Sequence, residues 1–283
     1  MITQLRFELR KLIRSKGFYL SFAALAAFVL LMLWGFYSYA QQKTSGLAGE
    51  QFKYTYESKS YFNGLTFALY SLIFAFSLVI PIFVVMNAGS QIAGEQRSGT
   101  LRMMCIRPVS RVAIVLSKFL VVAIHTYLLM AFFIALNLLV GLLFIGWGSL
   151  ELYPGPLNLV DQPGTILRDE AVWRFFYASF SGAWALLVVA AVANLFSVLF
   201  ENPVTAVAAT LAVYLTLYIV GRIEFFITLS PYFFTTNMDF WRDVLKPEIP
   251  WASFNQQAAT CGAYIFGLLL LSIVIFERKD ITN

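Results

Sequence analysis

The sequence predicts an all-α integral membrane protein: six transmembrane helices, an N-terminal amphipathic interfacial helix and a short outer helix before the last span. Of the 283 residues, 60% are apolar and 12% carry a formal charge, whereas soluble domains are about half apolar and about a quarter charged. The apolar residues form runs of roughly 20, enough helix to cross about 30 Å of hydrocarbon. Stretches such as Leu268 to Leu271 do not alternate in polarity, which favours helices over β-barrel strands.

The chain is predicted to form a single transmembrane domain over residues 1–283. Its elements are an interfacial helix at 1–17, spans at 18–40, 65–86, 113–145, 175–200, 204–220 and 258–276, a polar loop at 88–111 and an outer segment at 221–257.

The first 17 residues have the pattern of a helix that lies on a membrane surface. At 100° per residue the apolar side chains share a narrow arc, and arginines form a row beside it. They are Ile2, Leu5, Leu9, Leu12 and Ile13, and Arg6, Arg10 and Arg14. The helix either anchors the first span or docks a partner. A cleaved signal peptide is the rival interpretation, because Ser38 to Ala40 resembles a cleavage site, but the apolar run is longer than that of a signal sequence.

The charges predict the orientation. If the N-terminus is cytoplasmic, the inside segments are 1–17, 87–118, 201–203 and 277–283, and they hold 12 of the 20 basic but 5 of the 15 acidic residues. The positive-inside rule therefore predicts a multi-pass protein of the cytoplasmic (inner) membrane with both termini in the cytoplasm. The orientation of the protein in the membrane also explains its excess of basic residues, so no nucleic-acid partner is expected.

The connections differ in character. Turn-forming residues in the segment 146–174 predict an irregular loop. In the outer segment, Thr236 or Asn237 can cap a short helix that ends before Pro247, and we expect this helix in the outer interface, with Trp241 near the membrane boundary. The residues Glu201 to Pro203 predict a tight hairpin between the fourth and fifth spans.

Catalytic and metal chemistry are not expected. No Walker-type glycine loop occurs, and one histidine cannot form an H-E-x-x-H zinc motif. The two cysteines, Cys105 and Cys261, are predicted on opposite membrane faces, so neither a disulfide nor a cysteine-based metal site is expected.

A few polar residues lie inside the spans. His125 is either a neutral side chain satisfied by a neighbouring carbonyl or hydroxyl, or a functional group. Thr210, Tyr214 and Tyr218 recur at steps of four on one face of the fifth span, which is typical of helix packing through hydrogen bonds but also of a substrate path.

The loop at 88–111 contains two predicted bends. Gly99 can end a helix in the left-handed conformation, Pro108 forces a second break, and Ser110 can cap the third span. A short helix over Thr100 to Ile106 is therefore predicted between them. On these observations alone, the basic loop either retains topology or contacts a partner.

This loop resembles that of the type-2 (ABC-2-like) branch of ABC transporter export permeases. The matching residues are Glu95, Gly99, Thr100, Leu101, Pro108, Val109, Ser110, Arg111 and Lys118. Residues 7–15 are similar to the elbow helix of that family, and residues 276–281 are similar to its C-terminal tail. The chain departs from the pattern at Ser117, where a glycine is common, and in lacking an acidic pair before Gly99.

The resemblance implies a permease subunit that pairs with a second copy or a paralogue, sits among membrane lipids and is not itself an enzyme. The elbow helix and the loop would dock on a cytoplasmic ABC ATPase dimer, which would bind the ATP and Mg²⁺. The implied coupling residues are Glu8, Arg10, Arg14, Glu95, Arg97, Gly99, Thr100, Leu101, Arg102 and Arg111.

The weak polarity of the spans suggests a lipid-like or amphipathic cargo. The near absence of charge inside them argues against an ion-coupled secondary transporter. That transporter and a non-transporting membrane scaffold remain the alternatives.

Overall fold

The computed structural model describes residues 2–44, 62–101, 110–152 and 164–279. Within these ranges, 6 helices are long and apolar enough to cross a membrane. They are Lys16–Tyr39, Gly64–Gln91, Arg111–Phe144, Arg168–Leu199, Pro203–Val220 and Trp251–Arg278. The predicted all-α, multi-pass architecture is confirmed.

The bounds of the elements follow the predicted order. The helix predicted at the interface corresponds to α1 (Ile2–Arg14), and the first candidate span lies in α2 (Lys16–Thr44). The second span is α3 (Gly64–Phe74), a π-helical turn η1 (Ala75–Val79) and α4 (Ile80–Gln91), and it continues into the short α5 (Ala93–Arg97). The remaining spans are α7 (Arg111–Phe144), α8 (Arg168–Leu199), α9 (Pro203–Val220) and α11 (Trp251–Arg278).

Polar side chains cap the starts of α7 and α9, and the cap at Ser110 was predicted. The Ser110 hydroxyl accepts a hydrogen bond from the Ala113 N–H (3.3 Å) at the start of α7. Asn202 accepts from the Val204 N–H (3.0 Å), and Pro203 follows as the first residue of α9. The α8–α9 connection is therefore the tight hairpin that was predicted.

The span α8 forms the centre of the bundle. In its most apolar stretch 83% of residues are buried, against 17% in α2 and in α9. Alanine, valine and serine supply much of its buried surface, so neighbouring helices approach it closely. The peripheral spans instead expose apolar side chains such as Leu31, Phe266 and Leu270, as a lipid-facing surface requires.

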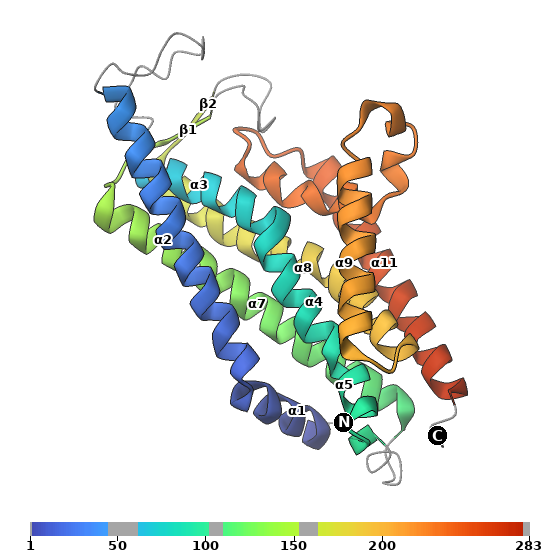
Figure 1. Cartoon of the computed structure of the whole chain (residues 1–283). Coiled ribbons are helices and arrows are strands. Elements are labelled where there is room, and N and C mark those ends of the chain that lie inside the picture. The colour runs from blue at the N-terminus through green and yellow to red at the C-terminus, as the bar shows by residue number, and fades with distance from the viewer. Residues whose placement is uncertain (1, 45–61, 102–109, 153–163, 280–283) are drawn as a thin grey trace.

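Elements far apart in sequence gather at each end of the bundle (Figure 1). At one end lie α1, α5, the α8–α9 hairpin and the end of α11, and we call this the terminal end. At the opposite end, β1 (Leu150–Leu152) pairs antiparallel with β2 (Gly164–Ile166). The segment 146–174 is thus not wholly irregular, because this ladder precedes α8, and α8 begins at Arg168.

The helix predicted before the last span is present. It consists of α10 (Phe234–Asn237) and a 3₁₀ stretch η4 (Met238–Leu245) that packs on α8. The Trp241 side chain is 0% exposed, with its ring 4.8 Å from that of Phe76, so the indole packs inside the bundle, and its level relative to the membrane boundary stays a prediction. The physical reason is that η4 turns its apolar residues toward α8 rather than toward lipid.

Gly64 of α3 and Gly141 of α7 lie at a close approach of two helices. A Cβ atom at Gly141 would lie 2.7 Å from the Gly64 carbonyl oxygen, whereas one at Gly267 would meet nothing within 4 Å. We expect Gly141→Ala to lower the free energy of unfolding by about 1–3 kcal/mol through overpacking. Thermal unfolding in mild detergent measures this. Gly267→Ala is the matched control, and equal melting of the two variants would refute the close approach.

Candidate coupling site at the terminal end

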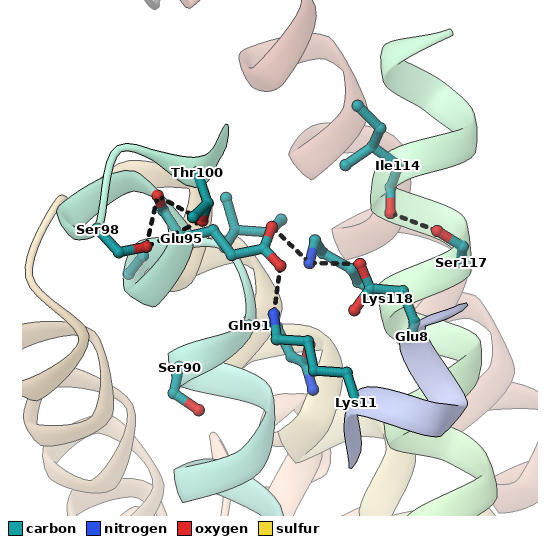
Figure 2. Close-up of polar contacts among 12 residues, drawn as sticks. Glu8, Lys11, Ser90, Gln91, Glu95, Ser98, Thr100, Ile114, Ser117 and Lys118 are labelled. Carbon is teal, nitrogen blue, oxygen red and sulfur yellow. Dashed lines mark hydrogen bonds and ion pairs between the residues drawn. The ribbon is translucent and has the colours of Figure 1, made fainter. Parts of the chain in front are cut away.

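A fully buried lysine joins three elements at the terminal end. Lys118, near the start of α7, is 0% exposed, and its Nζ lies 2.9 Å from Glu8 Oε1 of α1 and 2.7 Å from Glu95 Oε2 of α5. Lys11 of α1 forms a second ion pair with Glu95 Oε1. Figure 2 shows Lys118 between the two carboxylates. We call these four residues the Lys118 cluster.

The charges of the Lys118 cluster balance, with two carboxylates and two ammonium groups. Charges out of contact with water are tolerated only when they are paired, and removing one partner leaves an uncompensated buried charge. Glu8 and Glu95 are 1% and 6% exposed, so each of these carboxylates needs a positively charged partner. The Lys118 cluster therefore fixes α1 and α5 against the third span.

Two further contacts hold α5 on α8. The buried Ser197 hydroxyl accepts hydrogen bonds from the backbone N–H groups of Ile92 and Ala93, both at 3.0 Å. Lys279 donates to the carbonyl oxygen of Val198 (2.7 Å), near the end of α8, and to Gln96 Oε1 (3.1 Å). Burial lowers the pKa of Lys279, and the negative charge of Glu201 opposes this shift.

A small apolar core lies beneath these contacts. Its buried members come from α7, α8 and α11, from the junction between α4 and α5, and from the segment after Gly99. They are Ile92, Leu101, Ile114, Val115, Val198 and Phe276. Leu101 is 1% exposed, so it anchors the loop from below.

The chain reverses at an exposed turn directly after α5. Gly99 has φ +72°, which confirms the predicted left-handed conformation. Ser98 and Thr100 both donate to the Glu95 carbonyl oxygen (3.2 and 3.3 Å), which closes the turn. Arg97, Ser98 and Gly99 are exposed at its tip, and we call residues 97–99 the 97–99 turn. Arg102 and most of the helix predicted at Thr100 to Ile106 lie outside the described residues.

The predicted coupling residues therefore fall into two groups. Glu8, Glu95 and Leu101 are buried within the chain, while Arg10, Arg14, Arg97 and Gly99 are exposed and Thr100 is half-buried. Arg111 belongs with the first group, because its guanidinium donates to the carbonyl oxygens of Phe276 (3.0 Å), Glu277 (2.9 Å) and Lys279 (2.8 Å) at the end of α11.

Residues 4–156 match the family model described as "ABC-2 family transporter protein". This match covers 153 of the 283 residues, more than half of the chain. The chain belongs to the ABC-2 transporter family. The Lys118 cluster and the 97–99 turn lie wholly inside the matched region of this ABC-2 protein, whereas Ser197 and Lys279 lie outside it.

A curated relative comes from Bacillus subtilis (strain 168), where it is named "Uncharacterized protein YhcI". The two sequences are 25% identical over 214 residues, which is 74% of the ABC-2 chain and 66% of YhcI. The chain thus spans slightly less than two thirds of this relative.

Three polar residues of α9 in this ABC-2 protein make packing contacts. Thr210 is fully buried and donates to Ala206 O (2.7 Å) in its own helix. The Tyr214 hydroxyl donates to Ser77 O (2.9 Å) in the π-helical turn, where wider winding alters the backbone hydrogen bonds. The Tyr218 ring lies 3.5 Å from the guanidinium of Arg222. These contacts fit helix packing, and a substrate-path role stays a prediction.

His125 links three spans. With its proton on Nε2, it donates to Ser21 Oγ of α2 (3.3 Å) and accepts at Nδ1 from Asn87 Nδ2 of α4 (2.9 Å). Ser21 in turn donates to Phe18 O (2.6 Å). Both ring nitrogens thus have partners in a neutral histidine, the arrangement of a satisfied core side chain.

Proposed function

We propose that this ABC-2 chain is the membrane permease subunit of an ATP-driven exporter. It works as half of a dimer and couples to separate cytoplasmic ABC ATPase subunits, which bind ATP and Mg²⁺. The permease performs no chemistry of its own. The protein lies in the inner membrane, and its terminal end faces the cytoplasm. This orientation agrees with the basic residues at that end.

The observation that carries the proposal is the connection between the 97–99 turn and the third span. A force applied to an exposed loop moves a helix only if the contacts between them are stiff. In the Lys118 cluster, the buried ion pair between Glu95 and Lys118 joins α5 to α7. Lys118 also pairs with Glu8, which joins α7 to α1. A displacement of the 97–99 turn would thus be passed to α7 and α1 together.

The proposal assigns different tasks to the two groups of residues. Exposed Arg10, Arg14 and Arg97, with the backbone at Gly99 and Thr100, contact the ATPase; Arg102 remains in this group from the resemblance. Glu8, Glu95, Leu101 and Arg111 are positioning residues, because their side chains are buried or bonded within the chain. The cargo is lipid-like or amphipathic, since the spans offer few polar groups.

Two other functions make different predictions. An ion-coupled secondary transporter and a membrane scaffold both lack a stoichiometric ATPase. The test is purification of the tagged full chain in mild detergent, followed by mass spectrometry. We expect an ABC ATPase in stoichiometric amount, and recovery of folded permease without one would contradict the proposal.

A further inference from the structure

A lateral groove lies on the opposite end of the bundle from the Lys118 cluster. It is formed by α8, the outer segment around η4 and the start of α11, and its volume is about 580 Å³. Most of its lining is aromatic. The rings belong to Trp173, Tyr177, Phe180, Trp184, Phe240, Trp251 and Phe254.

The groove is charged at one end and apolar at the other. Glu170 and Arg174 line it near the start of α8, at the level where a membrane surface is expected. Toward the middle of the span, Trp184 lines the other end, and its indole Nε1–H donates to Ala258 O (3.1 Å), which ties α8 to α11 there. The 14 helical steps from Glu170 to Trp184 correspond to about 21 Å of helix, longer than the roughly 15 Å of hydrocarbon in one leaflet.

The charged end favours a cationic group. The guanidinium of Arg174 is already hydrogen-bonded within the chain. It binds Glu170 Oε1 and donates to the carbonyl oxygens of Val244, Lys246 and Pro247. Glu170 uses only Oε1 in these bonds, and its side chain is 53% exposed. The rings of Trp173 and Trp251 are exposed beside it, and aromatic faces attract ammonium groups.

We propose that this groove binds a single-chain amphiphile with an ammonium headgroup. The alkyl chain lies along α8 between the aromatic rings, and the headgroup contacts the free oxygen of Glu170 and the rings of Trp173 and Trp251. The gradient from a charged rim to an apolar interior matches the orientation of an amphiphile in one leaflet. The site does not depend on the ATPase, because it lies at the other end of the molecule.

The test uses the full chain in phosphatidylcholine nanodiscs and a hexadecyl trimethylammonium probe with a photoreactive diazirine at its chain end. We expect adducts concentrated on peptides that contain Trp184 and Ala258. Glu170→Gln keeps the oxygen that Arg174 binds. We expect this variant to lower labelling about fivefold, which corresponds to the binding free energy of one exposed charge pair. A probe with the same alkyl chain but a sulfate headgroup should label the protein weakly, and Glu170→Gln should change its labelling little.

Variants of the groove wall keep the proposal falsifiable. Trp251→Ala removes an exposed ring and should reduce labelling, as should Ala258→Phe, which narrows the groove. Trp34→Ala on α2, also an exposed tryptophan, is the matched control and should have no effect. Labelling spread over all spans and unchanged by these variants would mean bulk lipid contact and overturn the site. Intermolecular disulfides through Tyr177→Cys, with loss of labelling, would assign the groove to a second copy and overturn it as well.

Discussion

Replacing Lys118 by alanine is expected to remove most of the folded protein. The variant leaves Glu8 without its cation and Glu95 with only the half-exposed Lys11, inside a region that excludes water. Breaking a buried ion pair on one side costs about 3–5 kcal/mol, a large part of the total stability of a typical domain. Thermal unfolding followed by size-exclusion chromatography in mild detergent measures the loss.

Two controls separate charge from packing. Lys16→Ala removes an exposed lysine near the same end and should melt like the parent protein. The combined variant Glu8→Gln, Glu95→Gln and Lys118→Met removes the buried charges together, so it should recover much of the stability lost in Lys118→Ala. If Lys118→Ala itself melts like the parent, the Lys118 cluster does not hold the terminal end together.

Reversing the charge of Arg97 is expected to release the ATPase while leaving the permease folded. Arg97 is exposed at the 97–99 turn, and its guanidinium donates a long hydrogen bond to Asn202 Oδ1 (3.4 Å). Arginines are prominent among residues that dominate interface energies, so Arg97→Glu should lower ATPase recovery about tenfold, equivalent to roughly 1.4 kcal/mol. Quantitative co-purification measures the ratio of ATPase to permease.

The matched control places the same reversal at the opposite end. Arg168→Glu alters an exposed arginine near the start of α8 and should leave the ratio unchanged. A second variant, Gly99→Pro with Arg102→Glu, should also uncouple the ATPase, because proline cannot adopt φ +72° or donate the Gly99 N–H to Gln96 O. Normal ATPase recovery and hydrolysis with both turn variants would remove the 97–99 turn from the interface.

The spans and their caps could be predicted because they depend on local sequence. A run of about 20 apolar residues specifies a transmembrane helix wherever it occurs. Ser110 at the start of α7 and Gly99 at the turn act through the backbone of their own neighbours. For the same reason the tight connection at Asn202 and Pro203 could be read directly from the residues.

The Lys118 cluster could not be derived in this way, since Glu8, Glu95 and Lys118 are far apart in the chain. One signal was present: Glu8 shares the stripe of Leu5 and Leu12, at steps of three and four, so a carboxylate interrupts an apolar face. Such a group requires a buried cation. The sequence does not specify which cation, and the roles of Ser197 and Lys279 had no local signal.

The outer segment shows the same limit. Its helix-forming residues were recognised, but a 3₁₀ stretch such as η4 gains little from its own hydrogen bonds. Its position depends on contacts with α8 and on Arg174, which binds the carbonyl oxygens at its end. The burial of Trp241 follows from that packing, which hydropathy alone does not encode.

The most direct test of the coupling site is photo-cross-linking from its exposed tip. A photoreactive amino acid would be placed at Ser98 in the full chain, in native membranes, and at Arg168 as the control for the opposite end. The account predicts a covalent adduct between position 98 and a cytoplasmic ABC ATPase, absent from position 168. Adducts of position 98 with lipid alone, in membranes that contain the folded permease, would contradict it.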